Sequence, residues 1–183
     1  MNAQRGLTMI ELMVSLVIMG ILAAIAVPSF NRLIATSGTT SDANSLMSDL
    51  ALARSEAART GNPVTICLSS DGATCNAAAT TWTGGRIVFT DSATSGTIGV
   101  VDTGAGDKVL RYTSALINSS DRITGTSVPN TTYITYSSTG TVYGVTNATS
   151  AQFKVCRATG TFPGTIVSIS VTGRASAATT TCP

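Results

Sequence analysis

The sequence has no histidine and few charged side chains. Eleven basic and nine acidic residues make up 11% of its 183 positions, against roughly 25% in ordinary soluble proteins. Without histidine, the chain lacks the commonest general base and transition-metal ligand, and no Ser-His-Asp or Cys-His set can form. The scattered acidic residues do not indicate paired catalytic carboxylates, and no phosphate-binding lysine loop is present. We therefore expect a protein that is not an enzyme and that uses no metal and no cofactor.

Four cysteines are present: Cys67, Cys75, Cys156 and Cys182. An even number downstream of an apolar block is typical of an oxidising compartment. A zinc site usually needs ligand pairs two to four residues apart, and neither close pair meets this spacing. Four cysteines allow three disulfide pairings. Proximity in the sequence favours Cys67 with Cys75 and Cys156 with Cys182.

One long apolar run dominates the N-terminal part. Positions 12–31 carry no charge for twenty residues, a length that spans a hydrocarbon core of about 30 Å as a helix. A secretory signal peptide is the alternative, because Ala-Ile-Ala at 24–26 imitates a cleavage site. The leader before the run has only six residues, however, and a carboxylate lies just inside the apolar stretch. These two features favour a membrane-spanning helix.

That carboxylate is Glu11. An ionisable group in an apolar segment is costly and indicates a functional site with a nearby partner. Cleavage after Gly6 would make Leu7 the first residue and place its free amine one helical turn from Glu11. Between staggered neighbouring helices, an amine–carboxylate pair would fix the axial register of an assembly.

Residues 5–14, Arg-Gly-Leu-Thr-Met-Ile-Glu-Leu-Met-Val, resemble the prepilin motif of type IV pilins and type II secretion pseudopilins. The resemblance implies a prepilin peptidase that cuts after Gly6 and methylates the Leu7 amine. The family usually has Phe at that first position, so Leu7 is a departure. Gly20 and Pro28 fall where type IV pilins often carry a helix-weakening pair. The implied location is the bacterial inner membrane, with other pilins or pseudopilins as filament partners.

A helical pattern resumes after the apolar run and covers positions 41–60. Four apolar side chains fall on one face at helical spacing: Leu46, Leu50, Ala53 and Ala57. Three acidic side chains recur every seven residues on a separate stripe: Asp42, Asp49 and Glu56. We interpret this acidic stripe as a solvated face opposite a sheet, with contact to neighbouring subunits as the alternative. Gly-Asn-Pro at 61–63 predicts the helix end, and Gly-Thr-Thr at 38–40 is a point where the helix could bend or break.

The remainder of the chain has a β-strand composition. Runs rich in Val, Ile, Thr, Tyr and Phe, separated by turn residues, predict seven strands: 64–68, 86–90, 109–113, 132–137, 141–145, 152–157 and 165–172. A long polar loop or hairpin is expected at 92–106. A helix followed by strands, without βαβ alternation, indicates an α+β fold with an antiparallel sheet packed on one helix.

Residues 52–64, 67–72 and 82–89, with Asp91, resemble the GspH/FimT family, which contains H-type pseudopilins and the FimT and FimU minor pilins. With the prepilin motif, the resemblance covers about the first half of the chain and implies a type IV pilin fold. The expected organisation is a leader at 1–6, a transmembrane assembly helix at 7–31, its amphipathic continuation at 32–61 and a periplasmic β-rich domain at 62–183. Trp82 is interpreted as a core anchor.

Together these features predict a minor pilin or pseudopilin that primes or joins a filament. A type IV pilus is favoured over a secretion pseudopilus because of Gly20 with Pro28 and the disulfide-bearing body. The alternative is a DNA-binding minor pilin for uptake in natural transformation, because some FimT-type relatives resemble DNA receptors with a Gly-Arg-x-Arg signature. Here Arg174 matches the first arginine, but Ser176 replaces the second. A single arginine contacts few phosphates, so a solvated charge is the favoured interpretation of Arg174.

Overall fold

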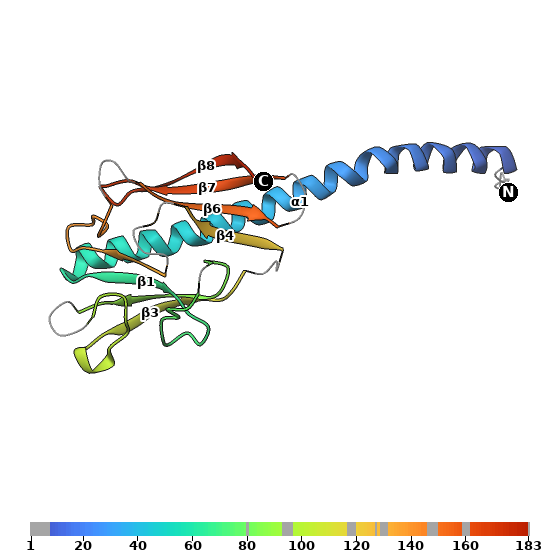
Figure 1. Cartoon of the computed structure of the whole chain (residues 1–183). Coiled ribbons are helices and arrows are strands. Elements are labelled where there is room, and N and C mark those ends of the chain that lie inside the picture. Colours follow the sequence, from blue (N-terminus) through green and yellow to red (C-terminus); the bar gives the residue numbers. More distant parts are fainter. Residues whose placement is uncertain are drawn as a thin grey trace, which may run out of the picture. The chain divides into compact units, whose positions relative to one another are not determined.

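A computed structural model describes residues 8–79, 81–92, 97–116, 120–126, 128, 132–145, 150–158 and 162–182 (Figure 1). The chain divides into two compact units, Met1–Ala35 and Thr36–Pro183. Helix α1 (Met9–Thr60) begins in the first unit and ends in the second. It ends where predicted: Gly61 has a φ of 71°, and its N–H donates to the Ala57 carbonyl at 3.0 Å. No break occurs at 38–40, where the chain remains helical.

The strands form two four-stranded antiparallel sheets within the second unit. In the first sheet, β1 (Val64–Leu68), β2 (Arg86–Thr90), β3 (Lys108–Thr113) and β5 (Tyr133–Tyr136) have the order β3-β2-β1-β5. In the second, β4 (Asp121–Gly125), β6 (Ala151–Arg157), β7 (Pro163–Ile169) and β8 (Ala175–Thr181) have the order β4-β6-β7-β8. A short 3-10 helix, η1 (Thr103–Ala105), precedes β3. The expected α+β class is confirmed, with two sheets in place of one.

Three segments differ from the strand prediction. The segment 141–145 is a turn joined to β5 by one bridge, Tyr136 with Val142, because Gly144 takes a φ of 76° that interrupts the strand. Strands β4 and β8 were not predicted. Strand β4 contains one large apolar residue, Ile123, and β8 contains none, so neither shows the hydrophobic alternation on which strand prediction depends.

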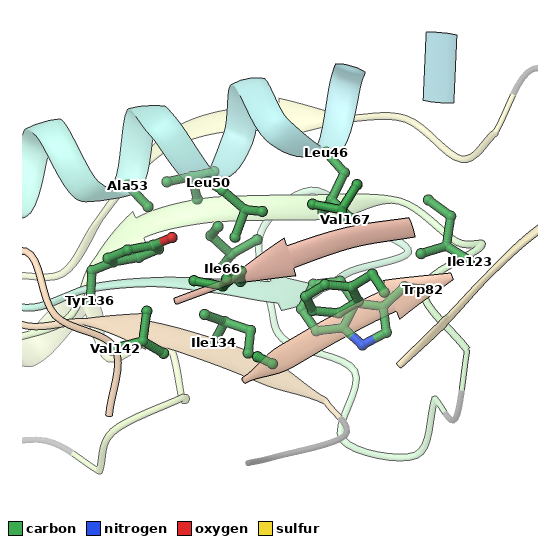
Figure 2. Packing of buried hydrophobic residues seen from close by; sticks show 14 of the residues in the cluster. Leu46, Leu50, Ala53, Ile66, Trp82, Ile123, Ile134, Tyr136, Val142 and Val167 are labelled. Carbon is green, nitrogen blue, oxygen red and sulfur yellow. The ribbon is translucent and has the colours of Figure 1, made fainter. Parts of the chain in front are cut away.

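The core lies between α1 and both sheets. The four predicted apolar residues on the helix are buried at 0–1% exposure: Leu46, Leu50, Ala53 and Ala57. Figure 2 shows Leu46 and Leu50 pointing from the helix toward Val167 of β7 and Ile66 of β1. Burial of each leucine contributes about 1.5–3 kcal/mol. The helix therefore joins the two sheets through one apolar face.

Trp82 is a core anchor, as predicted. Its side chain is 1% exposed, and its ring meets Phe153 of β6 edge to face, with centroids 4.9 Å apart. Its backbone N–H donates to the Ile123 carbonyl of β4 at 2.9 Å. Trp82 thus ties the segment before β2 to the second sheet.

The acidic residues of α1 do not form a solvated stripe. Asp49 is 1% exposed and accepts hydrogen bonds from Arg86 of β2, whose Nη2 lies 2.9 Å from Oδ2 and whose side chain is fully buried. Burial, followed by the nearby carboxylate of Asp121, raises the pKa of Asp42 to about 6. Glu56 is on the surface and pairs with Arg59 at 2.6 Å. The solvated interpretation was wrong for Asp49 because its partner comes from a strand, which helical periodicity does not reveal.

Two disulfides join Cys67 to Cys75 and Cys156 to Cys182, with Cα–Cα distances of 5.6 and 5.8 Å. These are the pairs that proximity in the sequence favours. The second links β6 to the residue after β8 and passes over Gly164 of β7. A Cβ at Gly164 would press on the Cys182 sulfur and lie 2.5 Å from the Val155 carbonyl oxygen. Glycine there lets the disulfide hold the end of β8 onto its sheet.

Candidate functional site

The described residues of the first unit form an exposed apolar helix. From Met9 to Ile34, every large hydrophobic side chain is at least half exposed. This part of α1 is long and apolar enough to cross a membrane. Apolar side chains on all sides of a helix are stable in a lipid bilayer or against other apolar helices, but not in water.

Glu11 lies in the first turn of this helix. The N–H of Glu11 donates to the Thr8 hydroxyl at 3.3 Å, and the N–H of Leu12 donates to the Thr8 carbonyl at 3.2 Å. Thr8 therefore caps the helix, and Glu11 stands at the third helical position of a Thr-x-x-Glu capping box. The positive end of the helix dipole favours a carboxylate there. Sequence reasoning missed this cap, although the four-residue pattern signals it.

The proposed cleavage and methylation residues, Gly6 and Leu7, lie outside the described residues. The helix begins two positions after Leu7, so an amine at Leu7 would directly precede the Thr8 cap. Gly20 and Pro28 both lie inside α1, which remains helical at each. Pro28 offers no N–H to the carbonyl four residues earlier, and nothing lies within 4 Å of the position that a Gly20 Cβ would take. The helix is therefore continuous through both residues, and their weakening of it remains a prediction.

Arg174 lies in the second unit, at the turn before β8, and is exposed. It lines a groove of about 510 Å³ with Arg54 and Ser55 of α1 and Thr139. The groove exists because two turns meet there. Gly140 and Gly173 take φ angles of 78° and 76°, and a Cβ on Gly173 would overlap the Gly140 carbonyl oxygen.

Tyr136, at the end of β5, contacts the turn that contains Gly173. Its hydroxyl donates to the Gly173 carbonyl at 3.2 Å, and burial raises the pKa of this phenol well above its usual value. The hydroxyl therefore keeps its proton and the hydrogen bond at any physiological pH. Sequence reasoning singled out Arg174 but not Arg54, because the two arginines are brought together only by packing of the two turns against α1.

Comparison with known families identifies both parts of the chain. The prokaryotic N-terminal methylation motif matches residues 1–27, and the family of type II transport protein GspH matches residues 42–173. The chain belongs to the GspH family. The apolar helix and the methylation motif fit anchoring of a pilin in the inner membrane.

Individual proteins resemble this chain in sequence or in structure. Fimbrial protein Q and the type IV major alpha-pilin, both of Moraxella bovis, are 58% identical to this chain over 40 residues, 22% of its length. The chain spans about a quarter of the length of these relatives. The type IV minor pilin FimU of Pseudomonas aeruginosa, solved in two crystal forms, is 24% identical. The TM-scores are 0.55 and 0.54, covering 75–76% of this chain and 86–91% of FimU. This match confirms the type IV pilin fold.

Proposed function

We propose that the chain is a minor pilin or pseudopilin that primes or joins a type IV pilus or a type II secretion pseudopilus. The observation that carries the proposal is an exposed apolar helix with one carboxylate in its capped first turn, attached to a compact disulfide-bonded unit. Such a helix is held by the inner membrane before assembly and by neighbouring apolar helices afterwards. The second unit lies in the periplasm, where disulfides form and persist.

Glu11 supplies the register in this mechanism. A prepilin peptidase cuts between Gly6 and Leu7 and methylates the Leu7 amine. The amine of an incoming subunit pairs with Glu11 of a subunit already in the filament, at one axial offset. Gly20 and Pro28 allow the helix between them to extend when neighbours pack tightly.

Glu11→Ala is expected to leave the protein in the membrane and to reduce its recovery in sheared filaments by about tenfold or more. Removing the charge makes residence in the bilayer easier, while deleting the partner of a neighbour's amine. The measurement is the ratio of filament-bound to membrane-bound protein on immunoblots. Glu56→Ala is the matched control, because it removes a surface carboxylate of the same helix outside the apolar segment. Equal filament recovery of Glu11→Ala and Glu56→Ala would refute the registration mechanism.

DNA binding for natural transformation is the second candidate. One observation favours DNA binding: Arg54 and Arg174 line the same groove. Ser176 stands where a second arginine of the signature is expected, and two guanidinium groups neutralise few phosphates. We therefore rank a structural filament role above a DNA receptor.

A further inference from the structure

Strand β8 is the last strand of the second sheet and the least protected edge in the described part of the chain. The other edge strands carry features that discourage pairing with a further strand. Strand β3 contains Lys108 and Arg111, β4 contains Arg122, and β5 has four residues followed by the Val142 bridge. Strand β8 has seven residues, Ala-Ser-Ala-Ala-Thr-Thr-Thr, with no charge and no proline. Such an edge is suited to accept another strand.

The register defines which groups of β8 face outward. The Ser170 N–H donates to the Arg174 carbonyl at 3.0 Å, and β7 and β8 continue from this pair with Ser168 opposite Ser176. Hydrogen-bonded pairs alternate along an antiparallel ladder. The N–H groups of Ala177 and Thr179 therefore point away from β7, toward the free edge. Both residues are exposed.

The groove described above, which we call the cationic groove, extends to the first residue of β8. Ala175 lines it together with Arg54 and Arg174, and none of the described residues that line it is acidic. Neither arginine makes a salt bridge with any described residue. The guanidinium fork matches a carboxylate in two parallel hydrogen bonds. The sequence also has no Asp or Glu after Asp121, so strands β6, β7 and β8 contain no carboxylate that could neutralise the groove.

We propose that an extended segment of a neighbouring filament subunit adds to the free edge of β8 and places a carboxylate between Arg54 and Arg174. A free strand edge recognises a peptide backbone, and the paired arginines at its end recognise an anionic group on that peptide. The edge offers alternating N–H and carbonyl groups, which a peptide backbone complements residue by residue, whereas the phosphodiester backbone of a nucleic acid has no N–H donors; a protein partner is therefore favoured. The inference rests on the proposed function, because that function supplies neighbouring subunits.

A photo-crosslinking amino acid at Ala178, an exposed residue of β8, reports the contact in cells that assemble the full chain into filaments. We expect one adduct with the mass of this chain plus a second pilin-like subunit. Ala177→Pro removes an outward N–H without touching the β7 ladder and should lower the adduct yield about fivefold or more. Ala177→Val keeps the N–H and favours a strand, so it should retain the adduct.

Charge reversal tests the groove separately. Arg54→Glu and Arg174→Glu should each lower the adduct yield about tenfold or more, because a like charge then faces the carboxylate. Arg59→Glu makes the same charge change on α1 outside the groove and should have little effect. Oxidised Cys156–Cys182 on a non-reducing gel confirms that each variant retains the second sheet.

Four results would overturn the inference. Equal adduct yields for Ala177→Pro and Ala177→Val would exclude strand addition. Undiminished yields for Arg54→Glu and Arg174→Glu would exclude carboxylate capture. An adduct with nucleic acid, or with no pilin-like protein, would exclude the proposed partner. The filament fraction is scored in parallel: absence of the unmodified chain from sheared filaments would refute the proposed function itself, whereas its presence without an adduct would refute only the docking at β8.

Discussion

Replacing Asp49 with Ala is expected to lower the free energy of unfolding by about 3–5 kcal/mol, because it leaves the fully buried Arg86 guanidinium without its counter-ion. Asp49 also accepts a hydrogen bond from Thr113 at 3.0 Å, so its removal frees a second donor at the interface between α1 and the first sheet. Urea titration of the full chain in detergent, followed by circular dichroism, measures the loss.

A double variant separates this charge effect from lost packing. Asp49→Leu with Arg86→Met removes both charges at similar volume and should be more stable than either single variant. Glu56→Ala, which breaks an exposed pair on the same helix, should cost no more than about 1 kcal/mol. If Asp49→Ala and Glu56→Ala proved equally mild, the buried pair would not be what fixes α1 on the first sheet.

Gly173→Ala should destabilise the second unit by about 2–6 kcal/mol, the sum of left-handed backbone strain and overpacking. The left-handed backbone strains any residue with a Cβ, and that Cβ would overlap the Gly140 carbonyl oxygen. The two turns must separate to relieve the overlap, which breaks the Tyr136–Gly173 hydrogen bond and widens the groove. The same urea titration measures the loss of stability.

Gly84→Ala is the matched control for Gly173→Ala. Gly84 is exposed, has no positive φ, and nothing lies within 4 Å of the position of an added Cβ. Its replacement should change stability by no more than about 0.5 kcal/mol. Gly173→Ala at wild-type stability would mean that the two turns do not meet as closely as the structure places them.

The helix and several strands could be predicted from the sequence, because the patterns that indicate them are local. The apolar run, the four buried residues of the helix face and the Gly-Asn-Pro end predict α1 without reference to the rest of the chain. Strands β1 and β2 each contain three apolar residues in a row, and their predicted bounds agree with the structure. Strand β8 could not be predicted from composition, because its Ala, Ser and Thr residues are held by pairing with β7 and by the Cys156–Cys182 disulfide.

The candidate sites divide in the same way. Glu11 stands out locally, as a carboxylate in an apolar run, so the sequence alone identifies it. The groove cannot be identified from the sequence alone, because Arg54 and Arg174 are 120 positions apart and line the same groove only in the folded chain, where the turns of Gly140 and Gly173 lie against each other. Likewise Asp49 looks like a surface residue until Arg86 of β2 is placed beside it. Charged residues that are far apart in the sequence and come together only in the folded chain could not be predicted from local sequence patterns.

The mass and N-terminal sequence of the protein extracted from membranes test the central proposal most directly. Processing as a pilin predicts a chain that begins at Leu7 and carries one methyl group on its amine, with Glu11 as its fifth residue. The whole apolar segment of α1 would then remain in the mature protein and be available for filament assembly. An N-terminus at or after Val27 would mean that the apolar run had been removed as a signal peptide, and it would contradict the assignment as a filament subunit.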